Sequence, residues 1–293
     1  MARSDRHARS GHLMMAISAV DIALWDLRGK HFGAPVYRLL GGPARPRLSA
    51  YASMGGESHN PAEAAQAARE ALQRGYTAQK WFFRHGPGSG PAGMRENLEW
   101  ARAIREAVGE QTELMFDCWQ GWDVPYAIAI GRELAALRPT WIEEPLPANR
   151  PDGFRRIREA TGIPLSTGEH HYTRFDVRPF LESGAIEYCQ ADPEWTGGIT
   201  ELLKICALAA AYDVKVIPHG HHIVAAAHVV ASQSPGLCPK VEYLLRHKER
   251  MQFFQKTVWR PENGWLELPD SPGLGVELDE AKIERREEIR FGD

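Results

Sequence analysis

The chain has 293 residues, 43% of them hydrophobic and 25% charged, which suits one large globular domain or two smaller ones. Its net charge of −3 gives no electrostatic reason to expect a nucleic acid or an anionic membrane as partner. No run approaches the roughly 18 apolar residues of a membrane-spanning helix, and four scattered cysteines favour a reducing compartment over a disulfide framework.

The N-terminus is basic and polar and lacks the apolar core of a secretory signal. We therefore expect a disordered leader over residues 1–14. Apolar residues then recur at mostly helical spacing from residue 16 to residue 39, where Gly33 and Pro35 mark a break. A helical segment over 15–45 is predicted.

From residue 48 onward, short apolar runs alternate with amphipathic stretches. The predicted strands span 48–54, 76–83, 113–116, 140–142, 163–166, 186–189, 214–217 and 240–245. The predicted helices between them span 61–74, 93–108, 124–137, 153–160, 176–183 and 198–212. This alternation implies parallel strands with right-handed crossovers.

The number of strand-helix units favours an α/β fold, a closed (β/α)7β TIM-like barrel over 46–250. An open doubly wound sheet stays possible, although no GxGxxG motif follows the first strand. The segment 251–293 departs from the rhythm and is rich in turn signals, so we expect it to lie outside the barrel wall.

Three acids directly follow three consecutive predicted strands: Asp117, Glu143 and Glu169, each 26 residues from the next. One βα unit has about this length, so the three occupy equivalent places at the C-terminal mouth of the barrel. Converging carboxylates repel each other unless a cation neutralises them, and hard oxygen ligands suit Mg²⁺, with Mn²⁺ as a substitute. The alternative is that each acid ends a strand or caps a helix. Glu144 is expected to support the site.

The series continues through Asp192 and His219, which follow the next two predicted strands. A carboxylate beside an imidazole sets its tautomer and increases its basicity, which predicts a general base. A satisfied core histidine is one alternative. A zinc site built from the histidines within 170–171 and 219–222 is another, although HExxH spacing and cysteine partners are missing.

The second predicted strand carries Lys80, which is a candidate contact for a substrate carboxylate or, alternatively, a snorkelling surface lysine. His85 follows as a further candidate substrate contact. The glycine-rich residues 86–90 favour a mobile loop over the mouth rather than a phosphate cradle. No GxSxG elbow or P-loop occurs, which argues against serine hydrolase and P-loop chemistry.

Together these segments resemble the enolase superfamily, in its mandelate-racemase-like subgroup. The matching segments are AISAVDIALWDLRGK, LMFDCW, WIEEPLP, STGEHH, QADPEWTGG, VIPHG and PGLGVEL. The resemblance implies that Asp117, Glu143 and Glu169 bind Mg²⁺ and that the Asp192–His219 dyad removes the proton α to a carboxylate. It also implies a place near that carboxylate for Glu242, with a structural glutamate as the alternative.

Many members carry a KxK motif on the second strand, whereas this chain has Lys80-Trp81-Phe82. The missing second lysine favours one-base elimination over a two-base racemase. The likeness is greatest to the sugar-acid dehydratases, the rhamnonate dehydratase group above all. This group implies stabilisation of an enediolate, loss of the 3-hydroxyl and a 2-keto-3-deoxy acid as product, with His170 as a substrate contact or auxiliary acid.

The capping domain of the family is longer than the helical segment 15–45, which is expected to be a remnant of that domain. The chain therefore resembles a truncated or short form of the family. The segment 251–293 is expected to pack on the side of this remnant. A metal-binding barrel without turnover is therefore one alternative, and a racemase or epimerase of the same fold is another. The expected partner is a small sugar-acid carboxylate, with no nucleic acid or membrane, and a cytoplasmic homo-oligomer is expected.

Overall fold

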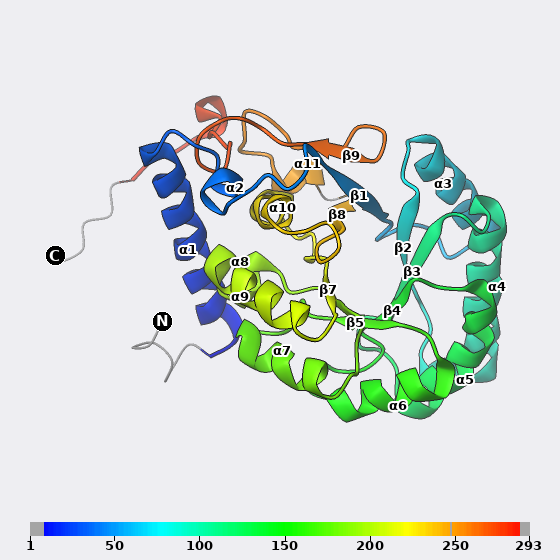
Figure 1. Ribbon diagram of the computed structural model, residues 1–293. Helices are drawn as coiled ribbons and strands as arrows, with labels where there is room; N and C mark the ends of the chain where they lie inside the picture. The colour runs from blue at the N-terminus through cyan, green and yellow to red at the C-terminus, as the bar shows by residue number, and fades with distance from the viewer. Residues whose placement is uncertain (1–8, 247, 288–293) are drawn as a thin grey trace.

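The computed structural model describes residues 9–246 and 248–287. In these residues, parallel strands form a curved wall and the helices that follow them pack around its outside (Figure 1). The strands of the wall are β1 Arg47–Ser53, β2 Ala78–Phe82, β3 Glu113–Asp117, β4 Trp141–Glu143, β5 Leu165–Thr167, β6 Tyr188–Cys189, β7 Lys215–Val216 and β8 Lys240–Leu244.

The strand order is β7-β6-β5-β4-β3-β2-β1-β8, so the first and last strands of the wall lie side by side. A sequential order that returns to β1 is that of a barrel, whereas a doubly wound sheet reverses direction at its middle. The prediction of a TIM-like barrel is therefore confirmed. Among the described residues no strand ladder joins β7 to β8, and the amide of Val216 reaches the carbonyl of Leu237 across this seam at 2.8 Å.

The predicted helices of the barrel are present with small shifts at their ends. They are α3 Pro61–Gln73, α4 Gly90–Val108, α5 Val124–Leu134 with the 3-10 turn η2 Ala135–Leu137, α6 Pro151–Thr161, α7 Thr173–Glu182 and α9 Gly198–Ala210. Three short helices were not predicted, α8 Pro193–Thr196, α10 Ile223–Ser232 and α11 Lys248–Met251. The residues of α10 are buried almost throughout, so it lacks the amphipathic period that revealed the others.

The N-terminal helix α1, Gly11–His31, begins before the predicted end of the leader at residue 14. Residues 1–8 of that leader lie outside the described residues. Met14 is buried, which explains why the helix extends this far. The helix is attached to α8 and α9 by hydrogen bonds from the Gly197 amide to Ser18 Oγ (2.9 Å) and from the Trp25 indole to Thr200 Oγ1 (2.9 Å).

The C-terminal segment runs outside the wall, along β1 and the N-terminal helices. Its strand β9, Trp265–Glu267, pairs antiparallel with β1. Further along, the Leu274 amide donates to Asp26 Oδ1 at 2.8 Å, and the Gly273 carbonyl accepts from Val36, the first residue of α2 Val36–Leu39. The last element of this segment among the described residues is the 3-10 turn η3, Glu280–Lys282.

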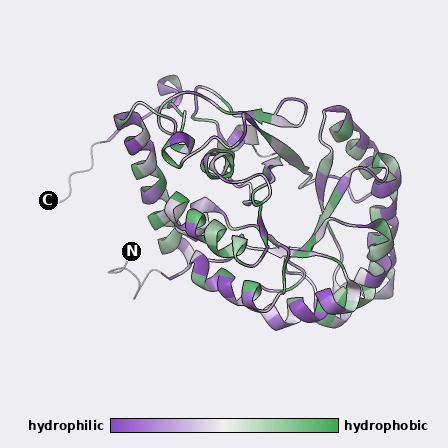
Figure 2. Cartoon of the chain, viewed as in Figure 1, coloured by the Kyte–Doolittle hydropathy of each residue, from purple (hydrophilic) through white to green (hydrophobic). Residues whose placement is uncertain are grey.

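Two hydrophobic clusters hold the barrel together. The larger lies between strands and helices, and Figure 2 shows hydrophobic and hydrophilic residues alternating along those outer helices. The smaller fills the inside of the wall and consists of Tyr51, Ala78, Met115, Trp141 and Ile217. These buried side chains form the floor of the mouth, and in barrels of this kind the mouth is where chemistry takes place. No helix in the described parts of the chain is long and apolar enough to cross a membrane.

Candidate metal and proton-transfer site

The residues predicted to carry the chemistry follow the C-terminal ends of neighbouring strands. Asp117 and Glu143 are the last residues of β3 and β4 and are paired in register, and Glu169 follows β5 by two residues. Asp192 and His219 each follow their strands, β6 and β7, by three residues. Because all these strands are parallel, the five side chains belong to one mouth.

Lys80 of β2 lies between three buried carboxylates at this mouth. Its Nζ is 2.5 Å from Glu143 Oε1, 3.0 Å from Glu242 Oε1 and 3.4 Å from Asp117 Oδ2. The indole of Trp141, in the floor, donates to the other oxygen of Glu143 at 3.0 Å. The lysine is 1% exposed, so it is not a snorkelling surface residue.

Burial changes the protonation of these acids. It raises the pKa of Asp117 to about 6, of Glu169 to about 7 and of Glu143 to about 8. Glu242 differs: burial alone would raise its pKa, but Lys80 lowers it to about 2. Lys80 pairs with three of these four carboxylates and Glu169 faces His219, so the acids of the cluster outnumber its cations. An oxygen-rich, negatively charged set of this kind fits Mg²⁺.

His219 and Asp192 form a buried carboxylate–imidazole pair. His219 Nδ1 donates to Asp192 Oδ2 at 2.8 Å, and Nε2 lies 3.3 Å from Glu169 Oε2. The other oxygen of Asp192 accepts from the Glu194 amide at 2.7 Å, which holds the carboxylate in place. Burial alone would lower the pKa of His219, but Glu169 and Asp192 raise it to about 10. The pair directs Nε2 toward the acids.

Glu144 takes a larger part in the mouth than a supporting role implies. Its backbone φ of 39° is unusual for a residue with a side chain, and its buried carboxylate accepts from His170 Nδ1 (2.8 Å) and Thr167 Oγ1 (2.9 Å). The ligand atoms of Glu144, Glu169 and His170 lie within 4.8 Å of one another. This group is a candidate metal-binding set that shares Glu169 with the predicted set, and the tandem acids at 143–144 were the sequence signal for it.

Two glycines allow the close contacts of the mouth. Gly168, just before Glu169, has φ 153°, and a Cβ there would lie 2.4 Å from the Gln190 amide nitrogen. Gly220 donates its amide to Glu242 Oε2 at 2.8 Å, and a Cβ would lie 2.8 Å from the Glu242 Cβ. A larger residue at Gly168 would clash with the backbone after β6, and one at Gly220 would displace Glu242.

His85 makes its interactions away from the acids. Its ring contacts Ser89 Oγ at 3.0 Å and Glu96 Oε2 at 2.9 Å, on the side of α4. The predicted mobile loop after it is instead the 3-10 turn η1, Pro87–Ser89, which leads directly into α4. A proline in the first turn of α4 favours helix there, which outweighs the glycines.

The sequence reasoning missed an aromatic residue among the histidines. The ring centroid of Trp195, in α8, lies 4.9 Å from that of His219, 5.4 Å from that of His221 and 6.2 Å from that of His170. His221 Nδ1 in turn donates to Glu194 Oε2 at 2.6 Å. Nothing in the residue types alone indicated that one tryptophan would contact three imidazoles.

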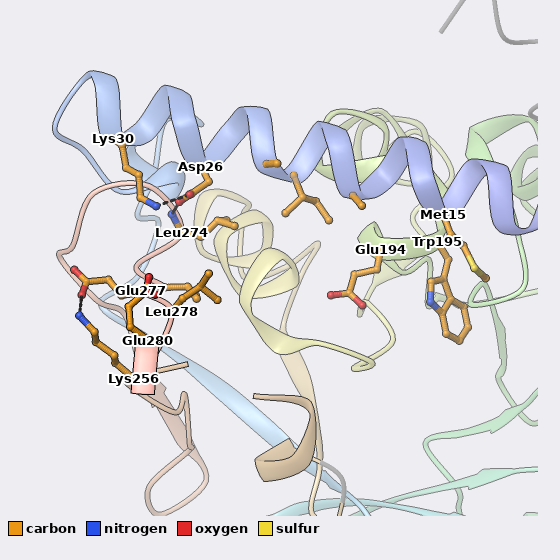
Figure 3. A pocket seen from close by; sticks show the side chains of 14 residues that line it. Met15, Asp26, Lys30, Glu194, Trp195, Lys256, Leu274, Glu277, Leu278 and Glu280 are labelled. Atoms are coloured by element: carbon orange, nitrogen blue, oxygen red, sulfur yellow. Dashed lines mark hydrogen bonds and ion pairs between the residues drawn. The ribbon is translucent and has the colours of Figure 1, made fainter. Parts of the chain in front are cut away.

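A cavity of about 940 Å³ is lined by residues of α1, by Glu194 and Trp195 of α8, and by the C-terminal segment. Figure 3 shows it between α1 above, Glu194 and Trp195 at one end, and the C-terminal segment at the other. The ion pair of Lys256 with Glu277 (2.9 Å) lies at that far end. Trp195 therefore borders both the histidines and this cavity.

Comparison with known proteins places these features in a family. Residues 63–282 match the model described as enolase C-terminal domain-like, and residues 1–41 match the N-terminal domain of mandelate racemase and muconate lactonizing enzyme. The chain is 37% identical to an L-rhamnonate dehydratase of Saccharopolyspora erythraea, over 93% of this chain and 68% of that protein.

Two solved structures are similar to the whole fold. Rhamnonate dehydratase from Gibberella zeae, complexed with Mg, has a TM-score of 0.85 and 34% identity, covering 96% of this chain and 68% of that one. The 3,6-anhydro-D-galactonate cycloisomerase from Zobellia galactanivorans also has a TM-score of 0.85 and 34% identity, covering 96% of this chain and 78% of that one.

Proposed function

This chain belongs to the mandelate racemase and muconate lactonizing enzyme family of the enolase superfamily, and from that premise we propose that it is a Mg²⁺-dependent sugar-acid dehydratase. It would remove the proton α to the carboxylate and eliminate the 3-hydroxyl, to give a 2-keto-3-deoxy acid. The observation that carries the proposal is the buried His219–Asp192 pair with Nε2 turned toward the acids.

Asp117, Glu143 and Glu169 would hold the metal, because they are buried acids at one mouth whose pKa values are raised, chiefly by burial, so a bound cation would stabilise their charged forms. When bound there, Mg²⁺ would stabilise negative charge on the substrate carboxylate and so make the α-proton more acidic. The competing set contains Glu144 and His170 with Glu169.

The chain's own residues divide the remaining work. In its neutral form, His219 would take the α-proton on Nε2, since Nδ1 is engaged by Asp192. Lys80 would bind the substrate carboxylate, and Glu242, which pairs with Lys80 at 3.0 Å, would lie near that carboxylate and orient the lysine. His85 would join them only if the turn after β2 rearranged, because its ring is engaged by α4.

Only one face of the α-carbon would meet a proton-accepting side chain, that of His219. Phe82 stands where a second strand lysine would be, and its ring lies 5.4 Å from Lys80 Nζ. A phenyl ring cannot accept a proton, which favours elimination over racemisation. His170, bonded to Glu144, is proposed as a substrate contact or auxiliary acid.

The cycloisomerase relative favours one extension of the substrate range. It is as similar to this chain as the solved dehydratase is, and the name of its substrate puts an ether oxygen on carbon 3. Acids with a 3-hydroxyl and acids with a 3,6-anhydro bridge therefore both belong in a substrate screen.

The test is a screen of sugar acids with Mg²⁺ for 2-keto-acid formation, with His219→Asn as the inactive control. We expect turnover that requires both the metal and His219. Absence of turnover of every acid contradicts the proposal. Deuterium exchange at the α-carbon without elimination supports an epimerase, and tight Mg²⁺ binding with neither reaction supports a metal-binding barrel.

A further inference from the structure

A second carboxylate–imidazole pair lies directly beside the first. Glu194 and His221 are 27 residues apart, as are Asp192 and His219, and each lies two residues further along the same loop. His221 Nδ1 donates to Glu194 Oε2 at 2.6 Å, against 2.8 Å in the first pair. The loops after β6 and β7 therefore build the same arrangement twice.

The two pairs differ in their access to water. Asp192 is completely buried and His219 is 12% exposed, whereas Glu194 and His221 are 26% and 42% exposed. The inner pair, Asp192 and His219, is thus protected from solvent, whereas the outer pair, Glu194 and His221, can exchange protons with solvent. The contact with Glu194 also orients the His221 ring, with Nε2 on the side away from the carboxylate.

Trp195 holds the two imidazoles close to each other. The centroids of the His219 and His221 rings are 6.4 Å apart and their planes differ by 23°, with the indole against both. Since a catalytic nitrogen reaches about 3 Å, one small acid can contact both rings. The neighbouring carbons of one substrate are then within reach of two separate proton-transfer groups.

Resting on the proposed dehydratase function, we propose that His221, oriented by Glu194, is the general acid that protonates the departing 3-hydroxyl. After His219 takes the α-proton, the electron pair left on carbon 2 forms the double bond to carbon 3. The bond from carbon 3 to oxygen breaks, and its electron pair stays with the oxygen. That oxygen takes the proton from Nε2 of protonated His221 and leaves as water. Solvent then reprotonates His221, and His219 returns its proton to solvent.

The other histidines of the mouth are engaged differently. His170 Nδ1 donates to buried Glu144 and lies 3.4 Å from Glu169, inside a group that can itself hold a metal. His222 contacts Gln255 of the C-terminal segment at 2.8 Å through Nε2. His221 and His170 both combine a carboxylate partner, contact with Trp195 and partial exposure, but His170 belongs to the possible metal group and His221 does not.

The experiment separates proton removal from elimination. For His221→Gln, Glu194→Gln and the surface control His31→Gln, exchange of the α-proton with deuterated water and formation of 2-keto acid are measured in parallel. For His221→Gln we expect elimination to fall about 100-fold or more, while α-exchange stays within about twofold of wild type. Glu194→Gln should show the same pattern with a smaller loss, and His31→Gln should match wild type.

A substrate analogue with fluorine on carbon 3 gives an independent readout. Fluoride departs without needing a proton, so His221→Gln should release it at close to the wild-type rate. Equal losses of α-exchange, elimination and fluoride release in His221→Gln would show that His221 only supports the fold or His219. Unchanged elimination would show that His221 has no role in this step. Either result overturns the inference. A wild-type protein that catalyses neither exchange nor elimination overturns the dehydratase proposal itself.

Discussion

The two sides of the barrel mouth differ in how their buried carboxylates are neutralised. On the side of β2, β3, β4 and β8, carboxylates that are at most 2% exposed surround the single ammonium of Lys80. On the side of β5, β6 and β7, each of three imidazoles has its own carboxylate partner, and Trp195 lies among them. The first side lacks positive charge and, together with Glu169 at the border between the two sides, suits a bound cation. The second is balanced pair by pair and suits proton transfer.

The largest expected effect breaks the second side alone. His219→Asn removes the proposed base, so both α-exchange and elimination should fall about 10³-fold in kcat/KM. Stabilisation of the protein by Mg²⁺ should persist, because the proposed ligands remain. Activity within tenfold of wild type in this variant would contradict the assignment of His219.

The next effect isolates the first side. At 100 times its dissociation constant, a ligand stabilises the folded protein by about 3 kcal/mol. Mg²⁺ should raise the thermal midpoint accordingly, and Glu143→Gln should abolish most of this rise. Binding should also release protons near pH 7, because burial raises the pKa of Glu143 to about 8.

Glu144→Gln is the matched control for that experiment, since it changes the neighbouring buried carboxylate in the same way. If Glu144→Gln removes the response to Mg²⁺ and Glu143→Gln does not, the metal is held by the set that contains His170. The proposed ligands would then be wrong.

A buried histidine outside the mouth, His228, is expected to make the stability of the protein depend on pH in the direction opposite to His219. His228 of α10 accepts from the Tyr37 amide at 3.1 Å, and its Nε2 donates to the Leu274 carbonyl at 3.1 Å. Burial lowers its pKa from 6.5 to about 4. The unfolded chain therefore binds this proton more tightly, and the stability from neutral His228 is complete above pH 6.5 and lost as pH falls toward 4.

The size of this pH effect is about 2 to 3 kcal/mol in the free energy of unfolding, followed by denaturant titration between pH 7 and pH 4. His228→Asn is the comparison, because an amide does not titrate in this range. If wild type and variant lose stability in parallel, His228 is not the group responsible. His219 has the opposite sign, since its pKa is raised to about 10.

The smallest effect concerns the aromatic residue of the second side. Trp195→Leu removes ring contacts worth about 0.5–1.5 kcal/mol, so elimination should fall severalfold. Trp195→Phe should recover part of that loss, and the response to Mg²⁺ should stay unchanged in both. A weakened Mg²⁺ response would mean that the two sides are not separable.

The strand-helix rhythm was sufficient to predict the barrel and to align Asp117 with Glu143, because a regular βα repeat sets the position of each strand end. The directions of side chains were harder to predict. Glu144 turns into the mouth through a backbone φ of 39°, and Lys80 is drawn among acids from three other strands. Such contacts join residues far apart in sequence, so no local pattern records them. The Glu194–His221 spacing was readable, but its meaning required the geometry of the first pair.

The seam between β7 and β8 has a consequence for how the protein inactivates on heating. β7 is two residues long, and the Val216–Leu237 backbone bond crosses the seam where a ladder would otherwise lie. Segments with few backbone bonds open locally at lower free energy than the whole molecule unfolds. Amide hydrogen exchange should therefore be faster here than in β3 and β4, next to His219 and His221. On warming, the residues that follow β7 should become disordered while β3 and β4 remain paired. Catalytic activity should therefore be lost at a lower temperature than Mg²⁺ binding.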